Sequence, residues 1–251
     1  MNIQLIVMLL ALGILPSIAM GASEEIQVYL DDHNKPREFG VETHINYVPS
    51  GRSSPEYAGE QPPFHVLRFT PEFSLGLTDS LEAGLYILST KSGDDNVNID
   101  GAKLRLKFIA PRPAKQDWFW GLNYELGRSS RRVSEQPFGS ELKGILGRKV
   151  GRFLLAGNAN VDWDFAGSPG LEVDLKIGYD LSKNWQVGIE HYAELGPIND
   201  LGNLSQQSQV LFGCVDWNSG KWDANFGIGQ GLTSVSDDCV IKLRVGTTFG
   251  R

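Results

Sequence analysis

The chain has 251 residues and a formal net charge of -7, and hydrophobic residues make up 41% of it. The acidic balance disfavours a nucleic-acid surface, because phosphate binding requires a basic face. Beyond the N-terminal region no run of about 18 apolar residues occurs, so the sequence predicts no bundle of membrane-spanning helices. The length is sufficient for one large domain.

The N-terminal region has the pattern of a secretory signal peptide. Residues 3–19 are almost entirely apolar, and small residues follow them. We therefore expect export and removal of residues 1–22, with cleavage after Ala19, Gly21 or Ala22. No lysine or arginine precedes the apolar stretch, so an uncleaved signal anchor stays an alternative. The following residues, 23–37, are mixed and acidic, and they are compatible with a periplasmic tail or with a segment inside a lumen.

The rest of the chain alternates apolar and polar residues. From Leu171 to Asp180 every odd residue is apolar and every even residue is charged or glycine, as in a strand with one apolar face. Repetition of this pattern predicts twelve strands, at 38–48, 66–77, 81–89, 101–110, 117–127, 140–148, 153–165, 171–180, 185–195, 207–217, 222–230 and 239–249. So many half-charged strands predict an all-β fold, a closed antiparallel up-and-down transmembrane β-barrel over residues 38–251.

The predicted connections differ in length between the two ends of the barrel. Short turns rich in Asn, Asp, Ser and Gly are expected at 78–80, 149–152, 181–184 and 218–221, with a somewhat longer link at 111–116. The other connections are mostly long, at 49–64, 90–100, 128–139, 196–206 and 231–238, and only 166–170 is brief. This asymmetry and the even strand number are typical of bacterial outer-membrane barrels with short periplasmic turns and longer extracellular loops. Pro71 cannot donate to a strand ladder, so we predict a bulge there.

The aromatic residues gather at one rim of the predicted barrel. All six tryptophans fall on its outward face, and these are Trp118, Trp120, Trp163, Trp185, Trp217 and Trp222. Trp118, Trp185, Trp217 and Trp222 lie beside the short turns, and Tyr179 and Phe249 map to the same level. Indole rings favour the membrane interface. We therefore expect the interface aromatics in contact with outer-membrane lipid to be Trp118, Trp185, Trp217, Trp222, Tyr179 and Phe249.

The inward faces carry charges of both signs. The expected lumen-lining basic residues are Arg68, Lys103, Arg105, Lys107, Lys242 and Arg244, and the acidic ones are Asp162, Asp164, Glu172, Asp174, Glu190 and Glu194. In a ring of twelve strands the two groups face each other, and they would orient a small polar or amphipathic permeant in a transverse field. Alternatively the charges pair and plug the interior, since twelve strands lie between the filled barrels of about eight and the open ones of about sixteen.

No motif in the sequence indicates enzyme chemistry. Outer-membrane lipid hydrolases need Ser and His side by side, and none of His33, His44, His65 and His191 stands in a His-x-Ser arrangement. Neither zinc spacing, nor a calcium loop, nor a phosphate-binding glycine loop is present, so no cofactor or metal is expected. An exported protein with Cys214 and Cys239 could hold a disulfide, but the alternation places the two on opposite faces.

One hairpin carries a family resemblance. Residues 71–85 read strand, Gly-Leu-Thr-Asp turn, strand, and residues 177–185 are similar. The hairpin resembles the outer-membrane barrels grouped as the "MetA-pathway of phenol degradation" family, which implies a barrel and little about a substrate. The C-terminal alternation that ends at Phe249 is of the kind read by the barrel-assembly machinery, although Gly250 and Arg251 follow it.

The sequence therefore predicts an outer-membrane barrel with a narrow or gated channel for the passive passage of small molecules. A structural or interaction barrel that does not transport is the first alternative. A lipid-modifying enzyme of the outer membrane is the second.

Overall fold

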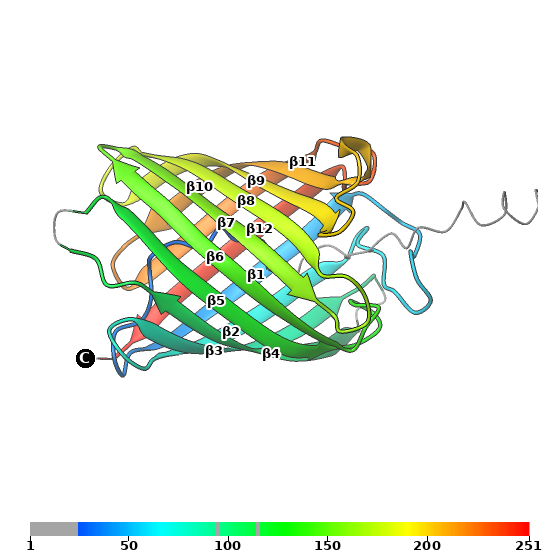
Figure 1. The fold of residues 1–251 in the computed structure, drawn as a ribbon, viewed down its shortest axis with the longest axis horizontal. Coiled ribbons are helices and arrows are strands. Elements are labelled where there is room, and N and C mark those ends of the chain that lie inside the picture. Colours follow the sequence, from blue (N-terminus) through cyan, green and yellow to red (C-terminus); the bar gives the residue numbers. More distant parts are fainter. Residues whose placement is uncertain (1–24, 94–95, 114–115, 251) are drawn as a thin grey trace, which may run out of the picture.

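The computed structural model describes residues 25–93, 96–113 and 116–250. In them the alternating segments form twelve strands, which are β1 (Phe39–Ser50), β2 (Leu67–Gly76), β3 (Leu81–Lys91), β4 (Val97–Ile109), β5 (Trp118–Ser129), β6 (Phe138–Val150), β7 (Phe153–Trp163), β8 (Gly170–Asp180), β9 (Trp185–Pro197), β10 (Ser208–Asn218), β11 (Trp222–Gly231) and β12 (Cys239–Phe249). Each strand pairs antiparallel with its neighbours in the chain, and β1 pairs with β12 to close the barrel (Figure 1). The predicted all-β up-and-down barrel is confirmed.

The helical content of the described residues is one short 3-10 turn, η1 (Leu204–Gln206). No helix among them is long and apolar enough to cross a membrane. The expected signal peptide lies outside the described residues.

The two ends of the barrel differ in their connections, as Figure 1 shows. The described C-terminal residues lie at the end that carries the turns after β2, β6, β8 and β10, which we call the short-turn end. The opposite end, which we call the long-loop end, carries the connection from β1 to β2 and η1.

One predicted loop is much shorter in the structure. Residues 90–100 were expected to be a loop, but β3 continues to Lys91 and β4 begins at Val97. The register between these strands shifts beside Gly101, whose added Cβ would lie 2.1 Å from the carbonyl oxygen of Arg128. Only glycine fits this close approach, so the β3–β4 pairing can shift its register by one residue and then continue to Lys91 and Val97. The alternation of apolar and polar residues alone did not indicate this shift.

The bulge predicted at Pro71 is wrong. Pro71 lies opposite Thr43 in an unbroken register between β1 and β2. On its other side the β2–β3 pairing skips from Phe69–Ser89 to Glu72–Tyr86 without a change of register. The two strands accommodate the missing N–H of Pro71 by leaving Thr70 and Pro71 unpaired with β3, and no extra residue is inserted.

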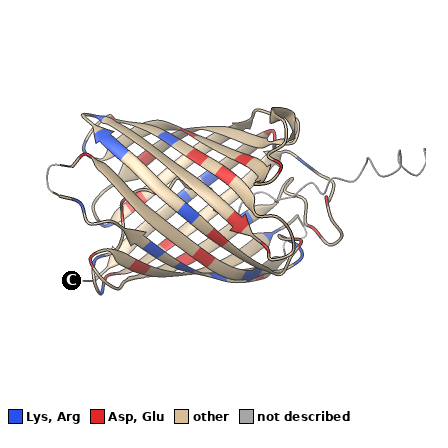
Figure 2. Ribbon diagram, viewed as in Figure 1, with Lys and Arg blue, Asp and Glu red and all other residues tan. Residues whose placement is uncertain are grey.

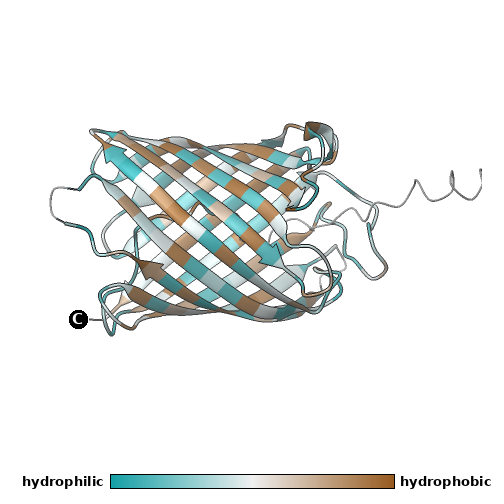
Figure 3. Cartoon of the chain, in the orientation of Figure 1, coloured by the Kyte–Doolittle hydropathy of each residue, from teal (hydrophilic) through white to brown (hydrophobic). Residues whose placement is uncertain are grey.

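The outer face of the barrel is apolar. Large side chains such as Leu106, Leu142 and Leu175 point outward and are exposed, and brown positions alternate with teal along the strands in Figure 3. The aromatic residues at the short-turn end are also on this face, where Trp185 and Trp217 lie 6.4 Å apart between ring centroids. A band of this kind cannot be covered by the protein itself, so it requires an apolar environment.

The two cysteines are not bridged. Cys214 is buried among lumen-facing side chains, and Cys239 lies on the opposite face of the wall at the start of β12. The expectation from strand parity that they point to different faces agrees with these free thiols.

Candidate functional site

The lumen is lined by polar and charged side chains. Figure 2 shows Lys and Arg interspersed with Asp and Glu along the strands. Many of them are buried, including Arg68, Glu72, Lys107, Asn123 and Lys242. A buried charge is costly unless it is paired or hydrogen-bonded, so the partners of these groups determine what the lumen can do.

The segment before β1, residues 25–37, runs through the barrel lumen to the short-turn end, where residues 35–37 are exposed. Tyr29 is fully buried there, and its backbone N–H donates to Oδ1 of Asn158 at 2.7 Å, while Nδ2 of Asn158 donates to its carbonyl oxygen at 3.1 Å. Its hydroxyl lies 2.7 Å from the hydroxyl of Tyr86. Asn158 is on β7 and Tyr86 is on β3, so one residue of this segment bridges distant walls of the barrel.

Three cations surround the ring of Tyr29. Lys143 Nζ lies 4.5 Å, Lys107 Nζ 5.0 Å and the Arg105 guanidinium carbon 5.9 Å from the ring centroid. Such contacts are worth about 2 kcal/mol or more when desolvated. Burial, and then the carboxylate of Glu25, raises the pKa of the Tyr29 hydroxyl well above its ordinary value, so the phenol stays neutral. The segment is held in the lumen by specific contacts.

Toward the short-turn end the same segment binds the barrel rim. The backbone N–H of Asn34 donates to Oε2 of Glu82 at 2.6 Å, and Asp31 pairs with Arg112 at 3.0 Å. A cavity of about 400 Å³ opens beside this contact. Its lining consists of Asp31, Arg112, Gln116, Asp117, Phe119, Lys149, Gly151 and Leu154. Asp31 is thus the one residue of the described segment that lines this cavity.

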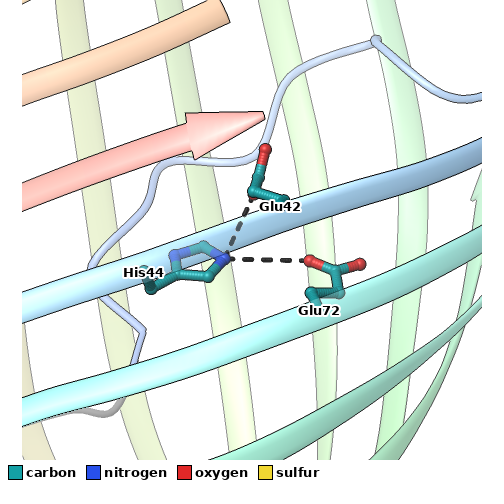
Figure 4. A group of neighbouring side chains, drawn as sticks. All are labelled: Glu42, His44 and Glu72. Atoms are coloured by element: carbon teal, nitrogen blue, oxygen red, sulfur yellow. Dashed lines mark ion pairs between the residues drawn. The ribbon is translucent and has the colours of Figure 1, made fainter. Parts of the chain in front are cut away.

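A cluster of ion pairs joins β1 to β4. Arg105 Nη2 lies 2.5 Å from Oε1 of Glu72 and also donates to Glu82. His44 lies against two carboxylates, with Nε2 at 3.1 Å from Oε1 of Glu42 and 3.7 Å from Oε2 of Glu72 (Figure 4). The three carboxylates and two basic groups form one buried, mutually compensating network.

The group Glu42, His44 and Glu72 has the ligand types of a metal site. One ligand atom from each lies within 4.8 Å of the others. However, Arg244 Nη1 donates to Glu42, and Arg105 is bound to Glu72. A divalent ion there would compete with two guanidinium groups for the carboxylates, so the geometry favours an ion-pair network.

A second buried cluster joins β8, β9 and β12. Glu190 is contacted by Lys242, and its Oε1 lies 2.9 Å from Nζ of Lys176. Lys242 Nζ also donates to the carbonyl oxygen of Ile26 at 3.1 Å. Lys242 thus links the wall of the barrel to the segment inside it.

These contacts correct the predicted separation of a basic wall from an acidic one. Arg105 pairs with Glu72 and Glu82, Arg244 pairs with Glu42, and Lys242 pairs with Glu190. Arg68 and Lys107 are buried, and Lys103 is half-buried on β4. The remaining acidic residues of the prediction, Asp162, Glu172, Asp174 and Glu194, lie on β7, β8 and β9.

Asp164 is a wrong assignment. The strand β7 ends at Trp163, and Asp164 is exposed in the following loop, where Oδ1 accepts hydrogen bonds from the backbone N–H groups of Ala166 and Gly167. An Asp that satisfies the next two or three amides initiates a turn, which ends the strand before the predicted boundary.

Sequence reasoning omitted several lumen residues from the candidate site. They include Glu72, Glu82, Glu125, Glu141, Lys143 and Asp216. Strand parity was a sufficient signal for most of them, since they alternate with outward apolar residues. The position of Tyr29 had no such signal, because its segment has no period.

The fold and the polar lumen define the class of the protein as a β-barrel of the outer-membrane type. No protein-family description matches the sequence, and no curated protein is similar to it. Among solved structures, an outer membrane channel from Pseudomonas putida F1 is similar with a TM-score of 0.60 at 14% identity, over 87% of this chain and 97% of that one. Below 25% identity such a likeness shows the fold alone.

Two porins have the same fold. The NanC porin matches with a TM-score of 0.55 at 10% identity, over 84% of this chain and 100% of that one. The KdgM porin, solved in complex with disordered oligogalacturonate, matches with a TM-score of 0.54 at 8% identity, over 84% of this chain and 99% of that one.

Proposed function

We propose that the protein is an outer-membrane channel for the passive passage of small polar or amphipathic molecules, gated by residues 25–37. The short-turn end faces the periplasm and the long-loop end faces the outside, as in other barrels with this loop asymmetry. The aromatic residues of the short-turn end lie at the periplasmic interface of the membrane. The chain is exported by its signal peptide, inserted by the barrel-assembly machinery, and distantly related to the phenol-degradation-type barrels that its hairpins resemble.

The observation that carries this proposal is the content of the lumen. Tyr29 and its neighbours are not part of the wall, yet they bridge β7 and β3. The wall behind them is polar, so water and ions can replace the segment when it moves. A barrel whose interior is occupied by a separate chain segment can open without rearranging its strands.

The ion-pair clusters favour the alternative of a barrel that does not transport. Glu190 and Arg105 connect several strands, which fills part of the lumen with wall side chains. An enzyme is supported least, since the described contacts of His44 and His191 are to carboxylate and amide groups rather than to a serine.

Conductance of the complete protein in planar lipid bilayers tests the proposal. We expect ohmic single-channel steps of small amplitude, with excursions to larger ones when the segment leaves the lumen. Liposome swelling with neutral sugars of increasing size would give the effective diameter. Absence of any steps, from protein whose folding is verified by heat-modifiable electrophoretic mobility, would support the non-transporting alternative.

Substitution on the outer face tests the membrane placement. Leu175→Arg puts a charge on the middle of β8, where the side chain faces outward. At the bilayer midplane an arginine costs about 2–4 kcal/mol of folding free energy. The measurement is urea-dependent folding into phospholipid vesicles, followed by tryptophan fluorescence.

The matched control is Ile99→Arg, at an exposed outward position near the long-loop end of β4. Near the interface the same charge costs about 0–1 kcal/mol. Equal costs at the two positions would mean that the outer face does not experience a depth-dependent apolar environment.

A further inference from the structure

Lumen carboxylates on β5 to β9 stand directly opposite one another. Across β5 and β6 Glu125 pairs with Glu141, and across β6 and β7 Glu141 pairs with Asp162. Across β8 and β9 Glu172 pairs with Glu194. Like charges in directly opposed cross-strand positions are destabilising. We call these five residues, together with Asp174 next to Glu172, the acid row.

Two lysines, Lys143 and Lys103, act on the acid row, whose six members are all carboxylates. Lys143 Nζ lies 3.3 Å from Oε1 of Glu141, and it also contacts the ring of Tyr29. Glu194 lies opposite Glu172 on β8 and opposite Ser208 on β10, so neither neighbouring strand places a cation directly across from it. The other clusters of the lumen pair their charges, so the acid row differs from the rest of the wall.

Two buried oxygen atoms at the acid row lack a donor. Asn160 and Asp174 are each 1% exposed, and Asn160 Nδ2 donates to Oε2 of Glu172 at 3.2 Å and to Oδ2 of Asp174 at 2.8 Å. Oδ1 of Asn160 and Oδ1 of Asp174 accept no hydrogen bond from any residue that the structure describes. A buried acceptor without a donor is unfavourable, because it has lost its hydrogen bonds to water. A ligand that brings both N–H donors and positive charge would complement these acceptors and the negative charge around them.

The spacing of the acid row distinguishes an organic cation from a metal ion. Among the described residues, the group of three or more His, Cys, Asp or Glu ligands with all ligand atoms within 4.8 Å is Glu42, His44 and Glu72, which lies elsewhere. No three carboxylates of the acid row meet that spacing among the described residues, so the row does not form a compact three-ligand metal site. Neighbouring strands lie about 4.8 Å apart, so the row extends over several strands. An ammonium group carries three donors and one charge, and a chain of such groups can follow the row.

We propose that the acid row binds linear diamines and polyamines that enter from the long-loop end. The proposal rests on the proposed channel function in so far as it makes these amines permeants of the lumen. Binding itself does not depend on passage, so the two can be tested separately.

Isothermal titration calorimetry of the complete, detergent-solubilised protein with spermidine at low ionic strength tests the binding. We expect saturable binding that Glu172→Gln combined with Glu194→Gln weakens about tenfold or more, since each charge-assisted hydrogen bond contributes at least about 1.5 kcal/mol. The matched control is Asp164→Asn, a carboxylate in the loop after β7 that should leave binding unchanged. Equal affinity in wild type and double variant, or no binding, would overturn the proposal.

Two further measurements keep the result interpretable. Glu194→Gln should raise the urea midpoint of folding in lipid, because it removes a like-charge pair, and an unchanged or lower midpoint would count against the repulsion on which the proposal rests. Calcium chloride titrated in place of spermidine should bind more weakly, and tighter binding of calcium would overturn the assignment to amines. Since neither measurement uses ion flow, failure of the channel proposal would appear in the bilayer experiment alone.

Discussion

Tyr29→Ala is expected to raise the single-channel conductance several-fold and to increase the time spent in the larger state. The substitution removes the hydroxyl that bonds Tyr86 at 2.7 Å and the ring that lies beneath Lys107 and Lys143. The three cations around position 29, Arg105, Lys107 and Lys143, are then better solvated by water than by the methyl group of alanine. The segment loses its main attachment in the middle of the lumen, and water occupies the space instead.

The matched control removes the same side chain from the outside of the barrel. Tyr124→Ala deletes a tyrosine that is 45% exposed on the outward face of β5, so it should leave the conductance of the lumen unchanged. A second variant, Asn158→Ala, removes the two hydrogen bonds to the backbone of Tyr29 and should act in the same direction as Tyr29→Ala. If both lumen variants conduct like the wild type, residues 25–37 do not limit the flow.

The location of this segment could not be predicted from the sequence. Residues 25–37 have neither a period of two nor a helical period, and a tail and a lumenal segment were equally compatible with them. What holds Tyr29 inside is a set of partners on β3, β4, β6 and β7, which come together only when the barrel closes. Such long-range contacts leave no local pattern at the residue itself.

The fold, in contrast, could be predicted because the alternation of apolar and polar residues within each strand identifies its outward and inward faces. The alternation at 171–180 appears unchanged as β8, with Asp174 and Lys176 inward and Leu175 exposed. The errors arose where a bulge or a turn of the backbone interrupts the alternation of apolar and polar residues. Gly101 extends a hairpin that was expected to be a loop, and Asp164 ends β7 early through a turn.

The sequence predicts which charged side chains face the lumen, but it does not predict which of them form ion pairs. Parity places Lys242 and Glu190 inward, but these residues are 52 positions apart and lie on strands that are not neighbours. Their pairing depends on the curvature of the closed barrel and on the register of every strand between them. Local pairs therefore replace the predicted basic wall at β4 and β12, whereas the acidic residues of β7 to β9 remain on the predicted side.

Glu190→Gln is expected to lower the free energy of unfolding by about 3–5 kcal/mol, the usual loss when one partner of a buried ion pair is removed. Glu190 is 1% exposed and compensates two lysines, Lys176 and Lys242. The glutamine keeps the size of the side chain and removes its charge. Lys176 retains Asp216 at 2.9 Å, whereas Lys242 retains only the hydroxyl of Tyr192 at 3.0 Å and one backbone carbonyl among its described donor contacts. Lys242 therefore accounts for most of the loss.

A surface ion pair supplies the control for this loss. Lys149 lies 2.8 Å from Asp180, but its side chain is 55% exposed, so Lys149→Gln should cost about 0–1 kcal/mol. Linear extrapolation of urea-dependent folding into vesicles compares the two variants. A loss for Glu190→Gln no larger than that of Lys149→Gln would mean that water enters the lumen and hydrates the lysines. In that case the lumen around β9 and β12 would be open to solvent, and the conductance of the same variant would show whether this opening extends through the barrel.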